Sequence, residues 1–192
     1  MTKEIDIFAQ VTPNPNTLKF VSDVNIIAQG SIEFPTANSG NESPLATEIF
    51  NIDGVQSIMF GTHFVSVTKA ESADWTALAE PVTKTIRSFL EAEKEAIPAD
   101  VLEKKQAEQK AAEQGGGSEA EQKIKHILNE EIRPAVAMDG GDVQFHSFED
   151  GILTLQLQGA CSSCPSATFT LKMGIENRLK EDIPEIKEVV QL

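Results

Sequence analysis

The 192-residue sequence has few basic residues, only two cysteines and no long apolar run. Its 16 Lys and Arg residues stand against 30 Asp and Glu residues, which gives a formal net charge of −14. Such a surface repels nucleic-acid phosphates and anionic lipid headgroups. No apolar stretch approaches the roughly 20 residues that cross a bilayer. We therefore expect neither nucleic acid nor a membrane as a partner.

The two cysteines, Cys161 and Cys164, are separated by only two residues. A secreted disulfide framework joins distant segments, so this close pair indicates a reducing compartment. The start, MTKEIDIF, has no basic segment followed by an apolar run, and it lacks the Arg-rich, acid-poor character of a transit peptide. We expect a cytoplasmic protein. A mature organellar form, with its presequence already removed, fits the same features.

The composition changes sharply between Glu91 and Ser118. This stretch, EAEKEAIPADVLEKKQAEQKAAEQGGGS, is rich in Glu, Lys, Gln and Ala and contains no aromatic residue. Residues 101–114 are compatible with a helix, but their apolar residues do not recur at the spacing of a stripe that packs. We predict an acidic, partly helical tether over residues 96–118, with a flexible glycine joint. It divides the chain into domains 1–95 and 119–192.

The first domain shows the signals of a small α+β fold. Short strands are expected at residues 18–21 and 31–34, and a hairpin at 55–60 and 63–69, where Val, Ile, Phe and Thr predominate. Ser43 followed by Pro44 predicts a helix start, with the serine as N-cap. Asp74 caps a second, amphipathic helix that begins with Trp75. This domain contains no cysteine, and we expect it to recognise partners.

The second domain shows the order α-β-β-α-β. Its first helix has apolar residues at helical spacing from Ile124 to Val136 and ends near Met138. The sequence Glu149-Asp150-Gly151 between two strand patterns predicts a hairpin. A loop at residues 159–166 opens into a second helix, and a last strand follows at 186–192. We therefore expect a chain of two small α+β domains.

The motif Cys161-Ser-Ser-Cys164-Pro165 carries the most informative chemistry. Two residues between the cysteines let both sulfurs face one side of a loop, as a metal site or a disulfide requires. Pro165 suits the first position of the following helix. The N–H groups at that helix start are expected to lower the pKa of the thiols and stabilise thiolates. The alternative, a pair of buried structural cysteines, is disfavoured because the sequence around them is typical of a polar loop rather than a core strand.

Three functional hypotheses fit this pair. A thioredoxin-type dithiol also lies between a strand and a helix, although here a β-hairpin precedes it rather than a βαβ unit. Zinc needs four ligands, and no histidine lies at finger spacing. A [4Fe–4S] cluster normally takes four thiolates, which a symmetric dimer would supply as two from each chain. A cluster shared in this way would lie near the surface, which suits a carrier.

Long segments of the sequence resemble the Nfu family. The pieces IRPAVAMDGGDVQF, GILTLQLQGACSSCPSATFTLKMGIENRL and IPEIKEVV resemble the NifU-like C-terminal domain of Nfu proteins. The pieces TPNPNTLKF and SPLATEIFNIDGVQSIMFG, with the Trp75 helix, resemble the Nfu N-terminal domain. Together these resemblances cover nearly all of the chain except the tether.

The resemblance implies a non-enzymatic iron–sulfur cluster carrier. Cys161 and Cys164 would be the cluster and metal ligands, and the cofactor would be a [4Fe–4S] cluster. We expect a homodimer in the loaded state, an upstream assembly scaffold as donor and apo iron–sulfur proteins as clients. The alternatives are a thioredoxin-like dithiol–disulfide oxidoreductase and a zinc-bridged interaction protein.

Other residues receive a structural interpretation. Asp139 and Asp142 flank two glycines, and we expect the DGGD sequence to form a turn rather than a cation site. His63, His126 and His146 are expected to be packed or solvent-facing rather than ligands. No Ser/His/Asp series, phosphate-binding loop or carboxylate pair indicates catalysis, so no catalytic residue is expected.

Overall fold

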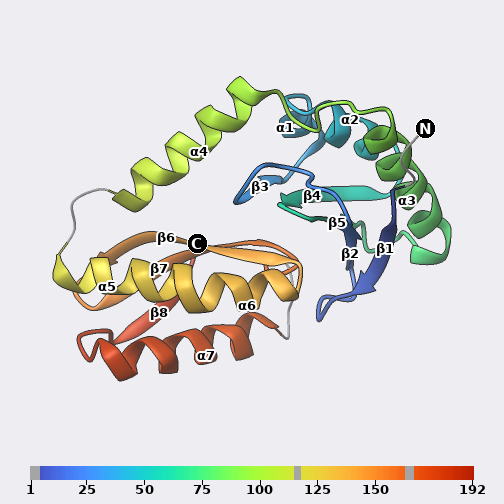
Figure 1. The fold of residues 1–192 in the computed structure, drawn as a ribbon. Coiled ribbons are helices and arrows are strands. Elements are labelled where there is room, and N and C mark those ends of the chain that lie inside the picture. Colours follow the sequence, from blue (N-terminus) through green and yellow to red (C-terminus); the bar gives the residue numbers. More distant parts are fainter. Residues whose placement is uncertain (1–4, 115–117, 163–166) are drawn as a thin grey trace.

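The computed structural model describes residues 5–114, 118–162 and 167–192. They form two α+β domains, each with its own sheet and hydrophobic core (Figure 1). The predicted fold class is therefore confirmed. Helix α4 (Ala99–Gln114) runs between the two domains along one side of the molecule (Figure 1).

The first sheet has five antiparallel strands in the order β1-β2-β5-β4-β3. The predicted hairpin is confirmed as the β4–β5 pair. Strand β1 was not predicted, because only one of its five residues is buried and no alternation marks it. The strands are β1 (Ile7–Val11), β2 (Thr17–Ser22), β3 (Ser31–Phe34), β4 (Val55–Gly61) and β5 (Phe64–Lys69).

Helices pack on one face of this sheet and bury the first core. They are α1 (Ala37–Gly40), α2 (Pro44–Phe50) and α3 (Trp75–Glu91). Both predicted helix starts are confirmed: the Ser43 hydroxyl accepts from the Ala46 N–H, and the Asp74 carboxylate accepts from the Thr76 N–H. The apolar stripe of α3 meets strand residues such as Phe20, so the helices and the sheet share one core.

The first part of the tether packs against the first domain. Ile97 is buried in the first core, and Val101 and Leu102 pack on it. Lys105 pairs with Glu42 at 2.7 Å. The sequence predicted a helix without a packing stripe, but two adjacent apolar residues at one helix end are sufficient for this local contact. The tether is therefore attached to the first domain at its N-terminal end.

The second sheet has three strands in the order β6-β7-β8, with β8 parallel to β7. The predicted α-β-β-α-β order is confirmed. Its elements are α5 (Glu119–Ile127), the π-helical turn η1 (Leu128–Ile132), α6 (Arg133–Met138), β6 (Gly141–Glu149), β7 (Ile152–Gly159), α7 (Ala167–Asp182) and β8 (Glu188–Gln191).

Helices α5 and α6 follow one another without a gap, and the π-helical turn η1 lies between them. The Arg133 N–H bonds to the Leu128 carbonyl, five residues back. Pro134 follows and has no N–H for the carbonyl four residues before it, which explains why the regular pattern changes here. The turn brings Arg133 to the start of β6, where the candidate site lies.

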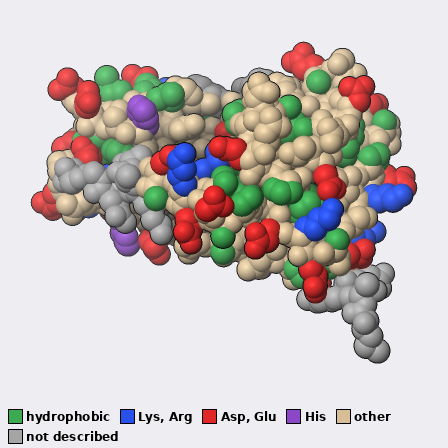
Figure 2. Space-filling view, turned by 90° about the horizontal axis from the view of Figure 1, so that it is seen from above, with side chains coloured by type: hydrophobic (Ala, Val, Ile, Leu, Met, Phe, Trp, Pro, Cys, Tyr) green, Lys and Arg blue, Asp and Glu red, His purple; other side chains and the backbone are tan. Residues whose placement is uncertain are grey.

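The second core occupies one face of the three-stranded sheet. Leu153, Leu155 and Leu157 are buried, as their alternation predicted, and they pack with helix residues such as Ile124 and Leu179. Among the described residues, no helix combines the length and the apolar character needed to cross a bilayer. Acidic side chains are spread over the face shown in Figure 2, with fewer basic ones between them.

Candidate cluster site

The candidate site begins where β6 and β7 meet at one end of their hairpin. Gly141 and Gly159 are paired across the two strands. Gly140 and Gly159 have φ angles of +77° and +62°, which favour glycine, so the chain turns sharply at both strand ends. The Ala160 N–H bonds to the Gly140 carbonyl at 3.1 Å and joins the two turns.

Cys161 lies in the turn that follows β7. Its N–H bonds to the Gln158 carbonyl at 3.3 Å. The Ser162 hydroxyl and N–H both bond to the Gly159 carbonyl, at 2.9 and 3.2 Å. These bonds fix the backbone on both sides of the cysteine. The turn therefore holds Cys161 in one defined position.

The Cys161 side chain is only 5% exposed and belongs to the second core. A methyl group on Gly141 would overlap its sulfur, so this close contact needs glycine. The sequence suggested an open polar loop, and for Cys161 that expectation is wrong. Its backbone is in a polar turn, but its thiol packs against the β6 backbone beneath it.

Cys164 lies outside the described residues, as do Ser163 and Pro165. Its role as the second ligand, and the predicted helix start at Pro165, therefore remain predictions. Helix α7 follows from Ala167, in the position expected for an element that continues from the loop.

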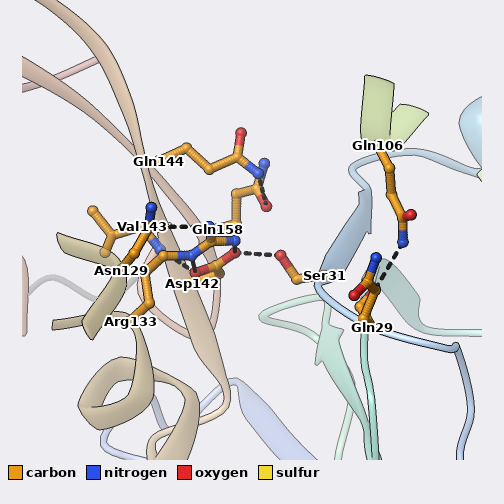
Figure 3. Close-up of polar contacts among 9 residues, drawn as sticks. All are labelled: Gln29, Ser31, Gln106, Asn129, Arg133, Asp142, Val143, Gln144 and Gln158. Carbon is orange, nitrogen blue, oxygen red and sulfur yellow. Dashed lines mark hydrogen bonds and ion pairs between the residues drawn. The ribbon is translucent and has the colours of Figure 1, made fainter. Parts of the chain in front are cut away.

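The DGGD sequence is a turn, as expected, and its two aspartates differ. Asp139 is exposed, whereas Asp142 is buried. Arg133 holds Asp142 through two bonds, from Nε to Oδ1 at 2.9 Å and from Nη2 to Oδ2 at 2.8 Å (Figure 3). Asp142 Oδ1 also accepts from the Val143 N–H at 2.8 Å, and Oδ2 accepts from the Ser31 hydroxyl (Figure 3). Asp142 is thus a structural anion rather than a cation ligand.

Three further polar residues lie around this ion pair. Asn129 accepts a bond from Arg133 Nη1 at 3.0 Å, and Gln144 bonds across the hairpin to Gln158 at 3.2 Å (Figure 3). Because Ser31 comes from β3, the network also joins the two domains. It fixes the start of β6 directly beside Gly141, which contacts Cys161.

The histidines do not join the site. His63, His126 and His146 are all exposed, which agrees with the expectation that they are packed or solvent-facing. Within the described ranges, no group of three or more His, Cys, Asp or Glu side chains is arranged to hold a metal ion. The described part of the site therefore offers one sulfur ligand, Cys161.

The first domain contributes residues that sequence reasoning did not place at the site. Asn14 is only 1% exposed and donates from Nδ2 to the Ala160 carbonyl at 3.0 Å. Glu33 accepts from the Gly159 N–H at 2.9 Å. Ser66 donates to the Gly140 carbonyl at 2.6 Å. The sequence did not indicate that these polar residues of the first domain face the second domain.

Burial shifts the pKa of two charged side chains of the first domain, Glu33 and Lys19. Burial raises the pKa of Glu33, an effect opposed by its bond from the Gly159 N–H and reinforced by nearby Asp142. Burial lowers the pKa of Lys19, and the charge of Asp139 opposes this shift. Both charged groups are thus partly removed from water where the domains meet.

Two protein-family models match the two domains of the chain. A family model described as a NifU-like domain matches residues 124–190, and one described as scaffold protein Nfu/NifU N terminal matches residues 7–93. A solution NMR structure of a NifU-like protein from Saccharomyces cerevisiae is 30% identical, with a TM-score of 0.45, and covers 50% of this chain and 86% of that one.

Two curated relatives match over nearly the whole chain. The human protein named NFU1 iron-sulfur cluster scaffold homolog, mitochondrial, is 42% identical over 187 residues, which are 97% of this chain and 71% of the human protein. The Drosophila persimilis protein of the same name is 37% identical over 187 residues, which are 97% of this chain and 64% of the fly protein. By these sequence matches, the chain belongs to the Nfu family of iron–sulfur cluster scaffold proteins.

Proposed function

We propose that this protein binds a [4Fe–4S] cluster between two copies of itself and delivers it to apo-proteins. Cys161 and Cys164 donate the thiolates, two from each chain. The observation that carries the proposal is the turn after β7, which fixes Cys161 at the junction of two glycine turns in a chain with only two cysteines. Four thiolates for one cluster then require a second chain.

Delivery is a ligand exchange without net redox chemistry. A client thiolate forms a bond to a cluster iron while the bond from Cys161 or Cys164 to that iron breaks. The client thiol loses a proton as it becomes a ligand, and the released cysteine can take one up. The cluster keeps its electrons throughout, so the exchange requires no reductant. This is transfer of a cargo rather than catalysis.

Three parts of the chain receive different tasks in this proposal. Residues 119–192 hold the cluster, residues 96–118 tether the domains, and residues 1–95 recognise partners. Those partners are apo iron–sulfur clients and an upstream assembly scaffold. The protein works in a reducing compartment, the cytoplasm or, as for the mitochondrial relatives, an organelle.

Anaerobic reconstitution with iron and sulfide tests the cluster and its ligands. We expect one [4Fe–4S] cluster for two chains, identified by Mössbauer spectroscopy and by iron and sulfide assays. Cys161→Ser and Cys164→Ser should each abolish stable binding, because either removes half of the dimer's thiolates. Ser147→Ala, near the opposite end of β6, is the control and should still load. Stoichiometric zinc without retained iron or sulfide would reject the proposal.

Light scattering on the same samples tests assembly. The apo chain should be monomeric, the loaded chain dimeric, and chelation should reverse the change, because the cluster binds only the state that supplies all four ligands. An identical tight dimer with and without cluster would contradict this coupling.

A transfer assay separates a carrier from an oxidoreductase. Loaded protein should activate a [4Fe–4S] apo-enzyme with time, while the apo protein should not turn over protein disulfides. Disulfide turnover without client activation would instead support the dithiol oxidoreductase.

A further inference from the structure

The outer face of the first sheet carries a row of four side chains at one level. Adjacent strands pair Lys19 with Ser66, Ser66 with Met59, and Met59 with Glu33. Residues paired in this way lie side by side across a sheet. The neighbouring positions along the strands, including Phe20 and Phe60, point to the other face and form the first core. We call Lys19, Ser66, Met59 and Glu33 the outer row.

Each member of the outer row meets either one of the two glycine turns of the second domain or the end of α6 that leads into the first turn. Lys19 Nζ donates to the carbonyls of Ala137 and Met138, at 2.8 and 3.3 Å. Ser66 bonds to Gly140 and Glu33 to Gly159, as described above. Met59 lies so close to Gly159 that a methyl group there would be 2.8 Å from its sulfur.

Asn14 extends this surface to the residue beside the ligand. Its side chain bonds to Ala160, immediately before Cys161. The contacts are therefore directed at the backbone that positions Cys161, and they depend on the absence of side chains at Gly140 and Gly159. A surface with this arrangement recognises the glycine turns of a NifU-like domain rather than an apolar groove.

The closed arrangement covers one side of the turn that leads to Cys161. With the first domain over residues 137–140 and 159–160, a second chain cannot approach the turn before Cys161 from that side. The interface is polar, and a cleft of about 520 Å³ lies beside it, between residues 61–64 of the first domain and α6 of the second. Polar interfaces between domains of one chain commonly separate.

We propose that the outer row and Asn14 form a cap that closes over the cluster turn, and that the cap must open before two chains can share a cluster. The effect of the cap on the loaded dimer rests on the proposed function, whereas the contact between the two domains does not. In the apo chain the cap protects the turn. Formation of the shared site selects the open state, so every change that weakens the cap favours the loaded dimer.

Amide hydrogen exchange in the apo full-length chain measures the cap without any cluster. The Gly159 N–H bonds across the domains to Glu33, whereas the next amide, Ala160, bonds within its own domain to Gly140. Opening the cap therefore exposes Gly159 and leaves the bond of Ala160 in place. The two neighbouring amides form an internal comparison, followed residue by residue by NMR.

The principal variant combines Lys19→Glu with Asn14→Asp. The first replaces a donor to two carbonyls by a carboxylate, and the second places an oxygen against the Ala160 carbonyl while keeping the acceptor that bonds to the Asn16 N–H. Gly159 exchange should accelerate at least about tenfold, since three hydrogen bonds are replaced by repulsion. Ala160 exchange should change less than about twofold. Lys94→Glu, whose lysine pairs with Glu48 inside the first domain, should change neither.

Ser66→Ala provides a milder test should the double variant not fold. It removes one hydroxyl and should accelerate Gly159 exchange about threefold, the effect of one lost hydrogen bond. Unchanged Gly159 exchange in a folded double variant or in Ser66→Ala would overturn the cap. So would equal acceleration of Gly159 and Ala160, because that pattern reports general loosening of the second domain.

Reconstitution then tests the consequence. If the open fraction rises tenfold, a dimer that needs two open chains should gain up to about hundredfold in its association constant. Dimerisation of loaded double variant and wild type, compared by light scattering, measures this gain. Normal loading with unchanged Gly159 exchange refutes the cap alone, whereas fast Gly159 exchange in chains that never load refutes the proposed function alone.

Discussion

Replacing Arg133 by Ala should destabilise the second domain far more than the same change at another arginine. Arg133 makes a two-point contact with Asp142 next to Gly141. Without it, the Asp142 carboxylate stays buried and keeps only the Ser31 hydroxyl and the Val143 N–H as donors. A carboxylate that is removed from water and loses its counter-charge strongly disfavours the folded state.

The size of the effect follows from burial. The side chains of Arg133 and Asp142 are 23% and 7% exposed. Breaking a fully buried pair costs about 3–5 kcal/mol. Because Arg133 is partly in contact with water and two donors to Asp142 remain, we expect a loss of about 2–3 kcal/mol in the free energy of unfolding.

Arg178→Ala is the matched control within the same domain. Arg178 also makes two bonds to one carboxylate, that of Glu131, each 2.7 Å long. However, the Glu131 side chain is 48% exposed, so water can solvate it after the change. We therefore expect a much smaller loss of stability than for Arg133→Ala. The two variants remove the same kind of contact from different environments.

Urea unfolding, followed by NMR signals of the second domain, measures the difference. With a slope typical of a small domain, 2–3 kcal/mol lowers the midpoint by about 1–2 M. Changing Asp142 to Asn in the Arg133→Ala background should recover part of the loss, because the buried charge is removed. Equal losses for Arg133→Ala and Arg178→Ala would refute the argument from burial.

Four other changes test separate features of the fold. Gly141→Ala should destabilise by about 1–3 kcal/mol and lower iron retention, since its methyl overlaps Cys161, whereas Gly174→Ala in α7 meets no atom within 4 Å and should stabilise by about 0.5–1 kcal/mol in thermal unfolding. The raised pKa of Glu33 contributes stability below pH 4.5 that is lost as pH rises through its folded-state pKa, and urea titrations of Glu33→Gln should lack this component. Leu179→Ala should cost about 2–5 kcal/mol, read from the same NMR signals.

Local signals in the sequence were sufficient for most of the fold. The N-caps at Ser43 and Asp74, and the turn at Asp150-Gly151, depend on neighbours within a few residues, and the structure confirms them. Strand β1 lacks such a signal, because it pairs along one edge only and exposes most of its side chains. Its place is determined by backbone bonding to β2, which leaves little trace in the sequence.

The environment of the candidate site could not be predicted in the same way. The motif identified Cys161 as a ligand candidate, but its burial depends on Gly141, twenty residues earlier and across the hairpin. Likewise, the sequence showed that DGGD is a turn, but not that Asp142 pairs with Arg133 and meets Ser31. These contacts are set by packing between elements, which a local pattern does not contain.

The two glycine turns position Cys161 and also form the contact between the domains, so a change at one of these glycines alters both. A methyl group on Gly159 would lie 2.7 Å from the Gly140 carbonyl within the site and 2.8 Å from Met59 in the outer row. Such a change therefore disturbs the position of Cys161 and the closure of the cap at once. Variants of the outer row leave the second domain's sequence intact. Because weakening of the cap favours the loaded dimer, loss of cluster binding in a glycine variant is assigned to the displaced Cys161 once an outer-row variant, in which only the cap is altered, binds the cluster normally.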